Sequence, residues 1–338
     1  MEKRERLGVR AGATFSIVGS VMGAGFISGR ELIEFFGGFF LPRTIAATGC
    51  FLFFFLLFFR LGAKYGGFSG VLKNLFGAFA LPVKALILFG GFVTAAGMLS
   101  AVNELLPRGG VFSAFLLLLL ACLIGGRGVK GLGVVNAILT PAVLLGVVFL
   151  AVQGGRLSPP EPTDGEILPF LGVLLYVGMN AFLSMPVLCD LGWTLKKGGV
   201  GVCGGAAILI GGAIGLILSV LAHDKCSYSK ALPLFYVLGG SSAVFSALSF
   251  GGIATTLFSS FYPLYRLAGV RGGAVGKTAL VGLTFAASFV SFKRIVGEVY
   301  PAFGVTGACV FFYALVREGL WRFKRRKKPA ALKGRRVF

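Results

Sequence analysis

Ten long apolar segments limit what this chain can fold into more than any other feature of its sequence. A bilayer core about 30 Å thick is crossed by about 20 predominantly apolar residues in a helix. The segments are continuously apolar instead of alternating, which favours helices over the strands of a β-barrel. They span Ala11–Phe36, Pro42–Phe59, Pro82–Leu106, Gly109–Gly126, Gly131–Val152, Ile167–Trp193, Val200–Ala222, Ser241–Leu267, Ala274–Phe292 and Val296–Val316. We therefore expect an all-α membrane protein with ten transmembrane helices.

The composition excludes the other broad classes of protein. Of the 338 residues, 56% are hydrophobic and 13% are charged, and a further 53 are glycine. Soluble chains are roughly 45–50% apolar with glycine included and about 25% charged, so the polar side chains here are too few to cover a soluble core. The 35 Phe residues and the many aliphatic residues argue against disorder.

The basic residues indicate a topology rather than a nucleic-acid partner. The net charge is +21, and the Lys and Arg residues lie between the apolar segments and in a C-terminal tail, residues 317–338. With the N-terminus inside, cytoplasmic segments hold 15 Lys and Arg before the tail and the opposite side holds 7. Cytoplasmic loops carry such an excess. We expect both termini in the cytoplasm and the lipid bilayer, not nucleic acid, as the partner.

The basic tail has two interpretations. Its cluster Trp321–Lys328 is rich enough in positive charge to bind anionic lipid. The interpretation that we favour is that these charges simply retain the tail in the cytoplasm.

Motifs for enzymatic chemistry, metal sites and cofactors are not found. The six Cys residues are scattered without a C-x-x-C pair, and His223 is the single His. Gly272–Thr278 reads GGAVGKT, but the first Gly of a phosphate-binding loop would fall at Arg271 and an apolar helix follows. The sequence predicts no catalytic residue and no cofactor, apart from Na⁺ or H⁺ as a coupling ion.

A single membrane domain over residues 1–338 is expected to contain two halves. Its longest polar connection, residues 153–166, holds three prolines and is expected outside the cell. It separates residues 11–152 from residues 167–316, with five apolar segments in each. An odd number of spans makes the halves enter the membrane from opposite sides, as in an inverted repeat.

The first helix of each half is expected to be interrupted. Ile17–Arg30 reads IVGSVMGAGFISGR, and Leu174–Pro186 reads LLYVGMNAFLSMP. Glycine weakens a helix by about 1 kcal/mol relative to alanine, and proline removes a backbone hydrogen bond. Unpaired backbone groups in lipid are costly, so matched interruptions predict a central binding site. For either segment alone, close packing of helices through small residues is the alternative.

Three segments resemble a known family. Val18–Phe36 (VGSVMGAGFISGRELIEFF), Tyr176–Asn180 (YVGMN) and Tyr300–Gly304 (YPAFG) resemble the YkvI-type bacterial membrane proteins. That family is similar to the amino acid–polyamine–organocation superfamily. The resemblance implies the ten-helix inverted-repeat fold of the leucine transporter LeuT, with helices 1 and 6 broken. It also implies a bacterial cell membrane protein that transports a solute.

The resemblance implies where a solute and a cation bind. The solute would lie at the two breaks, near Gly23, Ala24, Gly25, Phe26, Tyr176, Gly178 and Asn180. Free N–H groups near Gly25 and Phe26 suit a solute carboxylate. Asn180 either contacts the ligand or caps a half-helix. The cation would bind the carbonyls released at Gly19 and Met22, together with Gly252, Thr255 and Thr256 of helix 8.

The sequence departs from the family pattern or has a second interpretation at several of these positions. Threonine hydroxyls in membrane helices often bond to carbonyls of their own helix, so the pair at Thr255 and Thr256 has a structural alternative. Phe26 stands where the leucine transporter has an Asn, which argues against a second sodium site linked to the solute.

Arg30, Glu31 and Glu34 follow the first break and are candidates for gating or coupling. Charged residues in membrane helices are functional candidates by default, so Glu31 is a candidate proton carrier. Ser28 and Glu31 also fit a capping box, which we favour, with Glu31 accepting from the Ser28 N–H. Arg30 and Glu34 would then pair at an extracellular gate.

These features together predict a secondary transporter that works by alternating access. It would couple Na⁺ or H⁺ to uptake of an amino acid or a similar small solute. A ligand-sensing receptor subunit is the alternative, because spore-germinant receptors belong to the same superfamily. A passive channel would show a polar stripe through several helices, and we find none.

Overall fold

The computed structural model describes residues 2–106, 108–154, 168–230, 232–238 and 243–326, and this part of the chain is helical throughout. The proline-rich connection around Pro159 to Asp164 lies outside the described residues. The end of the basic tail, residues 327–338, lies outside them too. The expected position of the connection and the expected lipid contact of the tail therefore stay predictions.

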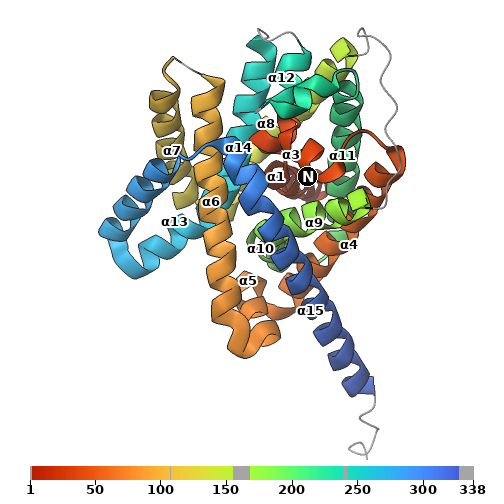
Figure 1. Cartoon of the computed structure of the whole chain (residues 1–338). Helices are drawn as coiled ribbons and strands as arrows, with labels where there is room; N and C mark the ends of the chain where they lie inside the picture. Colours follow the sequence, from red (N-terminus) through yellow and green to blue (C-terminus); the bar gives the residue numbers. More distant parts are fainter. Residues whose placement is uncertain (1, 107, 155–167, 231, 239–242, 327–338) are drawn as a thin grey trace, which may run out of the picture.

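The first half contains a broken helix followed by four long helices and a short linking segment (Figure 1). Its elements are α1 (Glu2–Val21), α2 (Ala24–Ile27), α3 (Arg30–Phe36), α4 (Leu41–Tyr65), α5 (Gly67–Val71), η1 (Leu72–Phe76), η2 (Gly77–Phe79), α6 (Ala80–Leu105), α7 (Gly110–Gly126) and α8 (Gly128–Gly154).

The second half repeats this order. Its elements are α9 (Leu168–Leu183), α10 (Met185–Leu195), α11 (Gly199–Leu221), η3 (Lys225–Ser229), α12 (Pro233–Val237), α13 (Ala243–Ala287), α14 (Phe292–Arg294), η4 (Ile295–Val299) and α15 (Tyr300–Arg326). Helix α13 consists of two helices joined at Gly273, where φ is 56°. Glycine adopts this left-handed conformation without the steric cost that other residues meet.

The ten expected spans correspond to these helices. In the described part of the chain five helices are long and apolar enough to cross a membrane, and the bent pair α9 and α10 makes a sixth. The others are the interrupted α1 to α3, the 17-residue α7, and the two arms of α13. Large apolar side chains are exposed on α7, α8 and α11, including Phe112, Leu123, Ile138, Leu145 and Ile208. Contact with lipid explains such exposure.

Glycines allow α9 and α15 to pack closely. A Cβ on Gly307 would overlap the Gly178 carbonyl, and a Cβ on Gly178 would lie 3.0 Å from the Gly304 carbonyl oxygen. Helices in lipid associate through close packing, because burial of apolar surface gives little drive there. This packing fixes α9 against α15 and places the end of α9 beside α1.

Candidate functional site

The first break lies where the glycine-rich segment predicted it. Helix α1 ends at Val21, and the Gly23 N–H bonds to the Val21 carbonyl at 2.9 Å instead of continuing the helix. The next N–H, that of Ala24, donates to the Met98 sulfur at 3.4 Å. A Cβ on Gly23 would lie 3.1 Å from both the Met98 sulfur and the Thr256 hydroxyl. A side chain here would push α6 or α13 back by a few tenths of an ångström, so glycine favours their close approach to the break.

The second break lies inside the predicted segment Leu174–Pro186, but after Gly178 and Asn180 and next to Pro186. Helix α9 continues through Gly178 and Asn180, and the chain bends by 59° between Leu183 and Met185. The Asn180 amide donates to the Tyr176 carbonyl of its own helix at 3.0 Å, so it caps no half-helix. Pro186 lies in the first turn of α10, where its missing N–H and its ring oppose continuation of α9.

A hydrogen bond joins the two breaks. The hydroxyl oxygens of Ser20, near the end of α1, and Ser184, at the bend, are 2.8 Å apart. Ser20 also donates to the Ile17 carbonyl at 2.7 Å. Because a serine hydroxyl has one proton, Ser184 is the donor in this pair.

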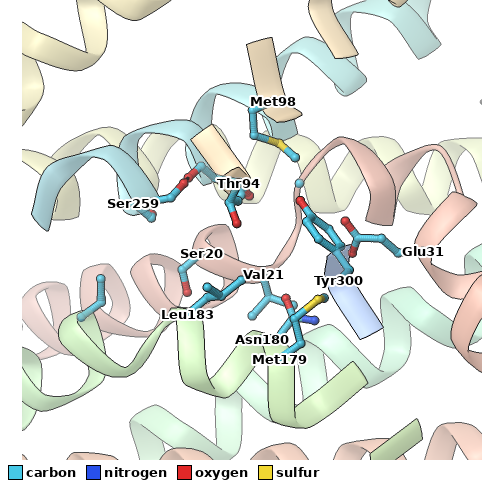
Figure 2. Close-up of a pocket in the computed structure, with 14 residues that line it drawn as sticks. Ser20, Val21, Glu31, Thr94, Met98, Met179, Asn180, Leu183, Ser259 and Tyr300 are labelled. Atoms are coloured by element: carbon cyan, nitrogen blue, oxygen red, sulfur yellow. Dashed lines mark hydrogen bonds between the residues drawn. The ribbon is translucent and has the colours of Figure 1, made fainter. Parts of the chain in front are cut away.

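A small cavity lies where the breaks meet (Figure 2). It has a volume of about 20 Å³, which is room for about one water molecule. Its walls combine polar and apolar side chains from seven helices, α1, α3, α6, α9, α10, α13 and α15, together with Gly23: Ser20, Val21, Glu31, Thr94, Met98, Met179, Asn180, Leu183, Val187, Thr256, Ser259, Ser260 and Tyr300. A solute larger than water enters this site only when lining side chains move.

The predicted solute-binding residues differ in how they relate to this cavity. Gly23 and Asn180 line it. Ala24, Gly25 and Phe26 form α2 beside it and are buried. Tyr176 is buried one turn before Asn180, where it packs against Phe35, Phe36 and Phe51. Gly178 lies on the face of α9 that contacts α15.

The five predicted cation-binding positions lie close together. The Thr256 hydroxyl donates to the Gly19 carbonyl at 3.0 Å, across from α13 to α1. A Cβ on Gly252 would lie 2.9 Å from the Met22 carbonyl oxygen. The Thr255 hydroxyl donates to the Gly252 carbonyl within α13 at 2.9 Å. Among the described residues no hydrogen bond reaches the Met22 carbonyl.

The capping box expected at Ser28 and Glu31 is wrong. The N-cap of α3 is Gly29, with φ of 79° and no side-chain cap. The Ser28 N–H bonds to the Ala24 carbonyl at 2.8 Å, so it offers nothing to Glu31. Because the helix begins one residue later than the box requires, Glu31 is its second residue instead of its third. The Glu31 side chain instead reaches the cavity and is 3% exposed.

Arg30 and Glu34 form the expected pair near one end of the site. The Arg30 guanidinium lies 2.8 Å from a Glu34 carboxylate oxygen and also donates to the Tyr228 carbonyl at 2.8 Å. The Leu234 N–H donates to the Ser28 carbonyl at 2.9 Å. The segment with η3 and α12 therefore covers this end of the broken helix.

Several cavity residues were not predicted from the sequence. Thr94 and Met98 of α6, Ser20 of α1, and Tyr300 of α15 are single polar or sulfur-containing residues in apolar helices. Tyr300 belongs to the segment Tyr300–Gly304, which resembles the YkvI-type proteins, but the sequence predicted no function for its side chain. A hydroxyl or amide at mid-helix is a weak signal, because which helix face it occupies depends on tertiary packing.

Asn136 of α8 was also missed. It is fully buried, and among the residues that the structure describes neither its amide nitrogen nor its amide oxygen has a hydrogen-bond partner. A Cβ on Gly19 would lie 3.2 Å from the Asn136 side chain. An unpaired buried amide is uncommon in a folded protein, and this one adjoins the carbonyl that Thr256 contacts.

A second, larger cavity of about 550 Å³ lies near α5. Its walls include Pro186, Asp190, Tyr262 and Arg266. Helices α10 and α13 contribute to both cavities. On α10, Val187 lines the small cavity and Asp190 the larger one, and on α13, Ser259 lines the small cavity and Tyr262 the larger one. Pro186 and Val187, which are consecutive in α10, line different cavities, and so do Ser260 and Tyr262 of α13.

The chain is similar to known membrane proteins, although no protein-family model matches it. It is 24% identical over 326 residues to the "Uncharacterized membrane protein YkvI" of Bacillus subtilis (strain 168), covering 86% of this chain and 90% of that protein. It is also similar to a crystal structure of MhsT in complex with L-phenylalanine, with a TM-score of 0.60, 16% identity, and 90% and 91% of the two chains covered.

A further similar structure is that of Mhp1, a nucleobase-cation-symport-1 family transporter, in a closed conformation with bromovinylhydantoin bound. The TM-score is 0.53 and the identity 14%, with 89% of this chain and 71% of that chain covered. The expected LeuT-like fold, with broken first and sixth helices, is confirmed. The chain is a multi-pass membrane protein.

Proposed function

We propose that the protein is a secondary active transporter that moves a small organic solute by alternating access and couples this to Na⁺ or H⁺. The observation that carries the proposal is the polar cavity between two broken helices, which the Ser20–Ser184 hydrogen bond joins. Backbone groups left without helix partners inside a membrane are costly unless a ligand or the protein satisfies them. Broken helices at mid-membrane are the usual binding sites of secondary transporters.

The arrangement around the cavity supports alternating access. On one side η3 and α12 cover the site through the bonds at Arg30 and Ser28. On the other side neighbouring residues of α10 and α13 line both this cavity and the larger one. We propose that α12 lies toward the outside, as the charge distribution predicts, and that both termini are in the cytoplasm of a bacterium. Anionic lipid is the proposed contact of the basic tail.

Na⁺ is the coupling ion that the oxygen cluster of α1 and α13 favours. Carbonyls of Gly19 and Met22 and the hydroxyls of Thr255 and Thr256 are hard, neutral oxygen ligands, which suit small hard cations. The released carbonyl of Met22 is free to turn toward such an ion. An amino acid or a related amine is the proposed class of solute, because MhsT binds L-phenylalanine in a fold of this kind.

Reconstitution tests the proposal. The purified chain in liposomes is given a mixture of labelled amino acids and amines, with an inward Na⁺ gradient, an inward proton gradient, or neither. We expect accumulation that requires one of the gradients and disappears when an ionophore collapses it. Binding of a solute in detergent without gradient-driven accumulation would contradict transport and support the ligand-sensing receptor.

A further inference from the structure

Glu31 places a carboxyl group directly against the first break. The turn at Ser28 and Gly29 folds α3 back along α2, so that a Cβ on Gly25 would overlap the Glu31 Oε1 atom. In Figure 2 the carboxyl group points toward the ring of Tyr300 at the edge of the cavity. This is the place where the sequence predicted the carboxylate of a solute. The protein supplies a carboxyl group of its own there.

The described part of the chain gives this carboxyl group no partner. Glu31 is 3% exposed, and no hydrogen bond or ion pair to it is present among the described residues. The neighbouring Arg30 is held by Glu34 and the Tyr228 carbonyl. The residues that line the cavity include no Lys, Arg or His. A buried ionised carboxylate is stable when a cation pairs with it and costly when none does.

Two neutral hydroxyls line the same cavity. The hydroxyls of Thr94 and Tyr300 are buried, and neither has a hydrogen-bond partner within the described part of the chain. Each accepts as well as donates, so each can receive an N–H of a ligand. Beside them, Met98, Met179 and Leu183 form an apolar wall. The cavity thus combines one negative group, hydrogen-bond acceptors and an apolar surface.

We infer that Glu31 binds the ammonium group of the solute, and that the solute is a small organic cation, a primary amine without a free carboxylate. A solute carboxylate would meet Glu31 at Gly25 and find no basic side chain in the cavity wall. Like charges in a buried site disfavour binding strongly. The inference rests on the proposed function and deepens it by giving the charge of the solute.

A ligand series on the unmodified protein tests the charge requirement. Isoamylamine, leucine and N-acetylleucine share one side chain and carry a positive, a zwitterionic and a negative head group. We would titrate the purified full chain with this series, and with the matching series built on alanine and phenylalanine, at fixed Na⁺ concentration by calorimetry. We expect the amine of at least one series to bind, the amino acid to bind at least about 10-fold more weakly, and the acetylated acid not to bind. A carboxylate that binds as tightly as its amine, or no binding by any amine, overturns the inference.

Variants test the role of Glu31. Truncating one partner of a buried charge pair costs enough to weaken binding at least about 30-fold, so we expect this loss of amine affinity in Glu31→Gln. Glu298→Gln is the matched control, because Glu298 is an exposed glutamate that pairs with Arg294. Unliganded melting temperature shows whether each variant folds. If Glu31→Gln does not fold, the ligand series on the unmodified protein by itself supports or overturns the inference.

The outcomes separate this inference from the proposed function. A folded Glu31→Gln protein that keeps the preference for amines overturns the inference. This holds also when the variant loses only proton-driven accumulation, because Glu31 then carries a proton instead of the solute. Amine binding that depends on Glu31 without gradient-driven uptake contradicts the proposed function and supports the inference.

Discussion

Replacing Thr256 with Val tests the contact between α1 and α13 at the proposed cation site. In a continuous helix the Gly19 carbonyl would accept from the Gly23 N–H, but that N–H bonds to Val21 at the break. The Thr256 hydroxyl donates to this carbonyl instead, at 3.0 Å. Thr256→Val preserves the shape of the side chain and leaves a buried carbonyl without this donor. Such an unsatisfied group costs about 1–3 kcal/mol.

The expected change is measurable as a melting temperature. For a chain of this size about 1–3 kcal/mol corresponds to a fall of about 1–4 °C, measured in detergent with K⁺ as the salt. The control is Thr284→Val in the second arm of α13, because Thr284 is fully buried and its hydroxyl donates to the Leu280 carbonyl of its own helix at 2.8 Å. That carbonyl retains its backbone partner in the helix. We expect a smaller fall for the control.

The response of the melting temperature to Na⁺ then shows whether the Thr256 hydroxyl binds the cation or only stabilises the contact between α1 and α13. Na⁺ at 100 times its dissociation constant stabilises a protein that binds it by about 2.7 kcal/mol. We expect the unmodified protein and Thr284→Val to gain melting temperature in Na⁺ over K⁺, and Thr256→Val to lose most of that gain. A full sodium response in Thr256→Val would refute cation binding by this hydroxyl. Equal destabilisation of the two variants in K⁺ would refute the argument about the Gly19 carbonyl.

Two further predictions concern contacts at the cavity, and a third concerns the position of the C-terminus. The double-mutant cycle of Ser20→Ala and Ser184→Ala should give a coupling energy of about 0.5–1.5 kcal/mol in thermal unfolding, because the two hydroxyls bond to each other; additive effects would contradict this. Gly25→Ala should weaken amine binding at least about 10-fold, because the methyl group overlaps a buried carboxyl oxygen, while Gly212→Ala, which has open space around it, should bind normally. A reporter that is active only after export should stay inactive when fused after Phe338, and activity there would contradict cytoplasmic termini.

The spans and the first break were predictable because their signals are local. Continuous apolar runs of bilayer length identify helices wherever they occur in a chain. At the first break the segment Met22–Gly25 contains two glycines, and Met98 and Thr256 would both lie only 3.1 Å from a Cβ at Gly23. Here local helix propensity and tertiary packing favour the same interruption.

The second break lies inside the predicted segment, but its exact position could not be predicted because helix propensity and tertiary packing disagree there. Gly178 and Asn180 lower helix propensity, yet α9 stays helical through both. Gly178 serves packing against α15, and the Asn180 side chain bonds within its own helix. Pro186 is the stronger signal, since it lacks the N–H that would continue the helix. Glycine at a helix interface and glycine at a break look alike in sequence.

The position of the Glu31 side chain could not be predicted because it depends on the backbone conformation of one residue, Gly29. The sequence Ser28-Gly29-Arg30-Glu31 satisfies the capping-box pattern, which assumes that Ser28 is the N-cap. The left-handed conformation of Gly29 moves the start of α3 one residue on, and the carboxyl group turns toward Gly25. Contacts between α1 and α13, such as that of Thr256 with Gly19, join residues 237 positions apart. No pattern within one segment contains that information.

The position of the second break also bears on how a solute would leave the site. The bend at Ser184 lies between Asn180, on the α9 side of the cavity, and Val187, which separates the cavity from the larger one near α5. Rotation of α10 about this bend would move Val187 and Asp190 while α9 stays packed against α15. A solute held by the first break and by Asn180 would then gain access to one side without first losing those contacts. The interruption of α9 and α10 would therefore act as a hinge at the binding site, and the Ser20–Ser184 hydrogen bond lies at its pivot.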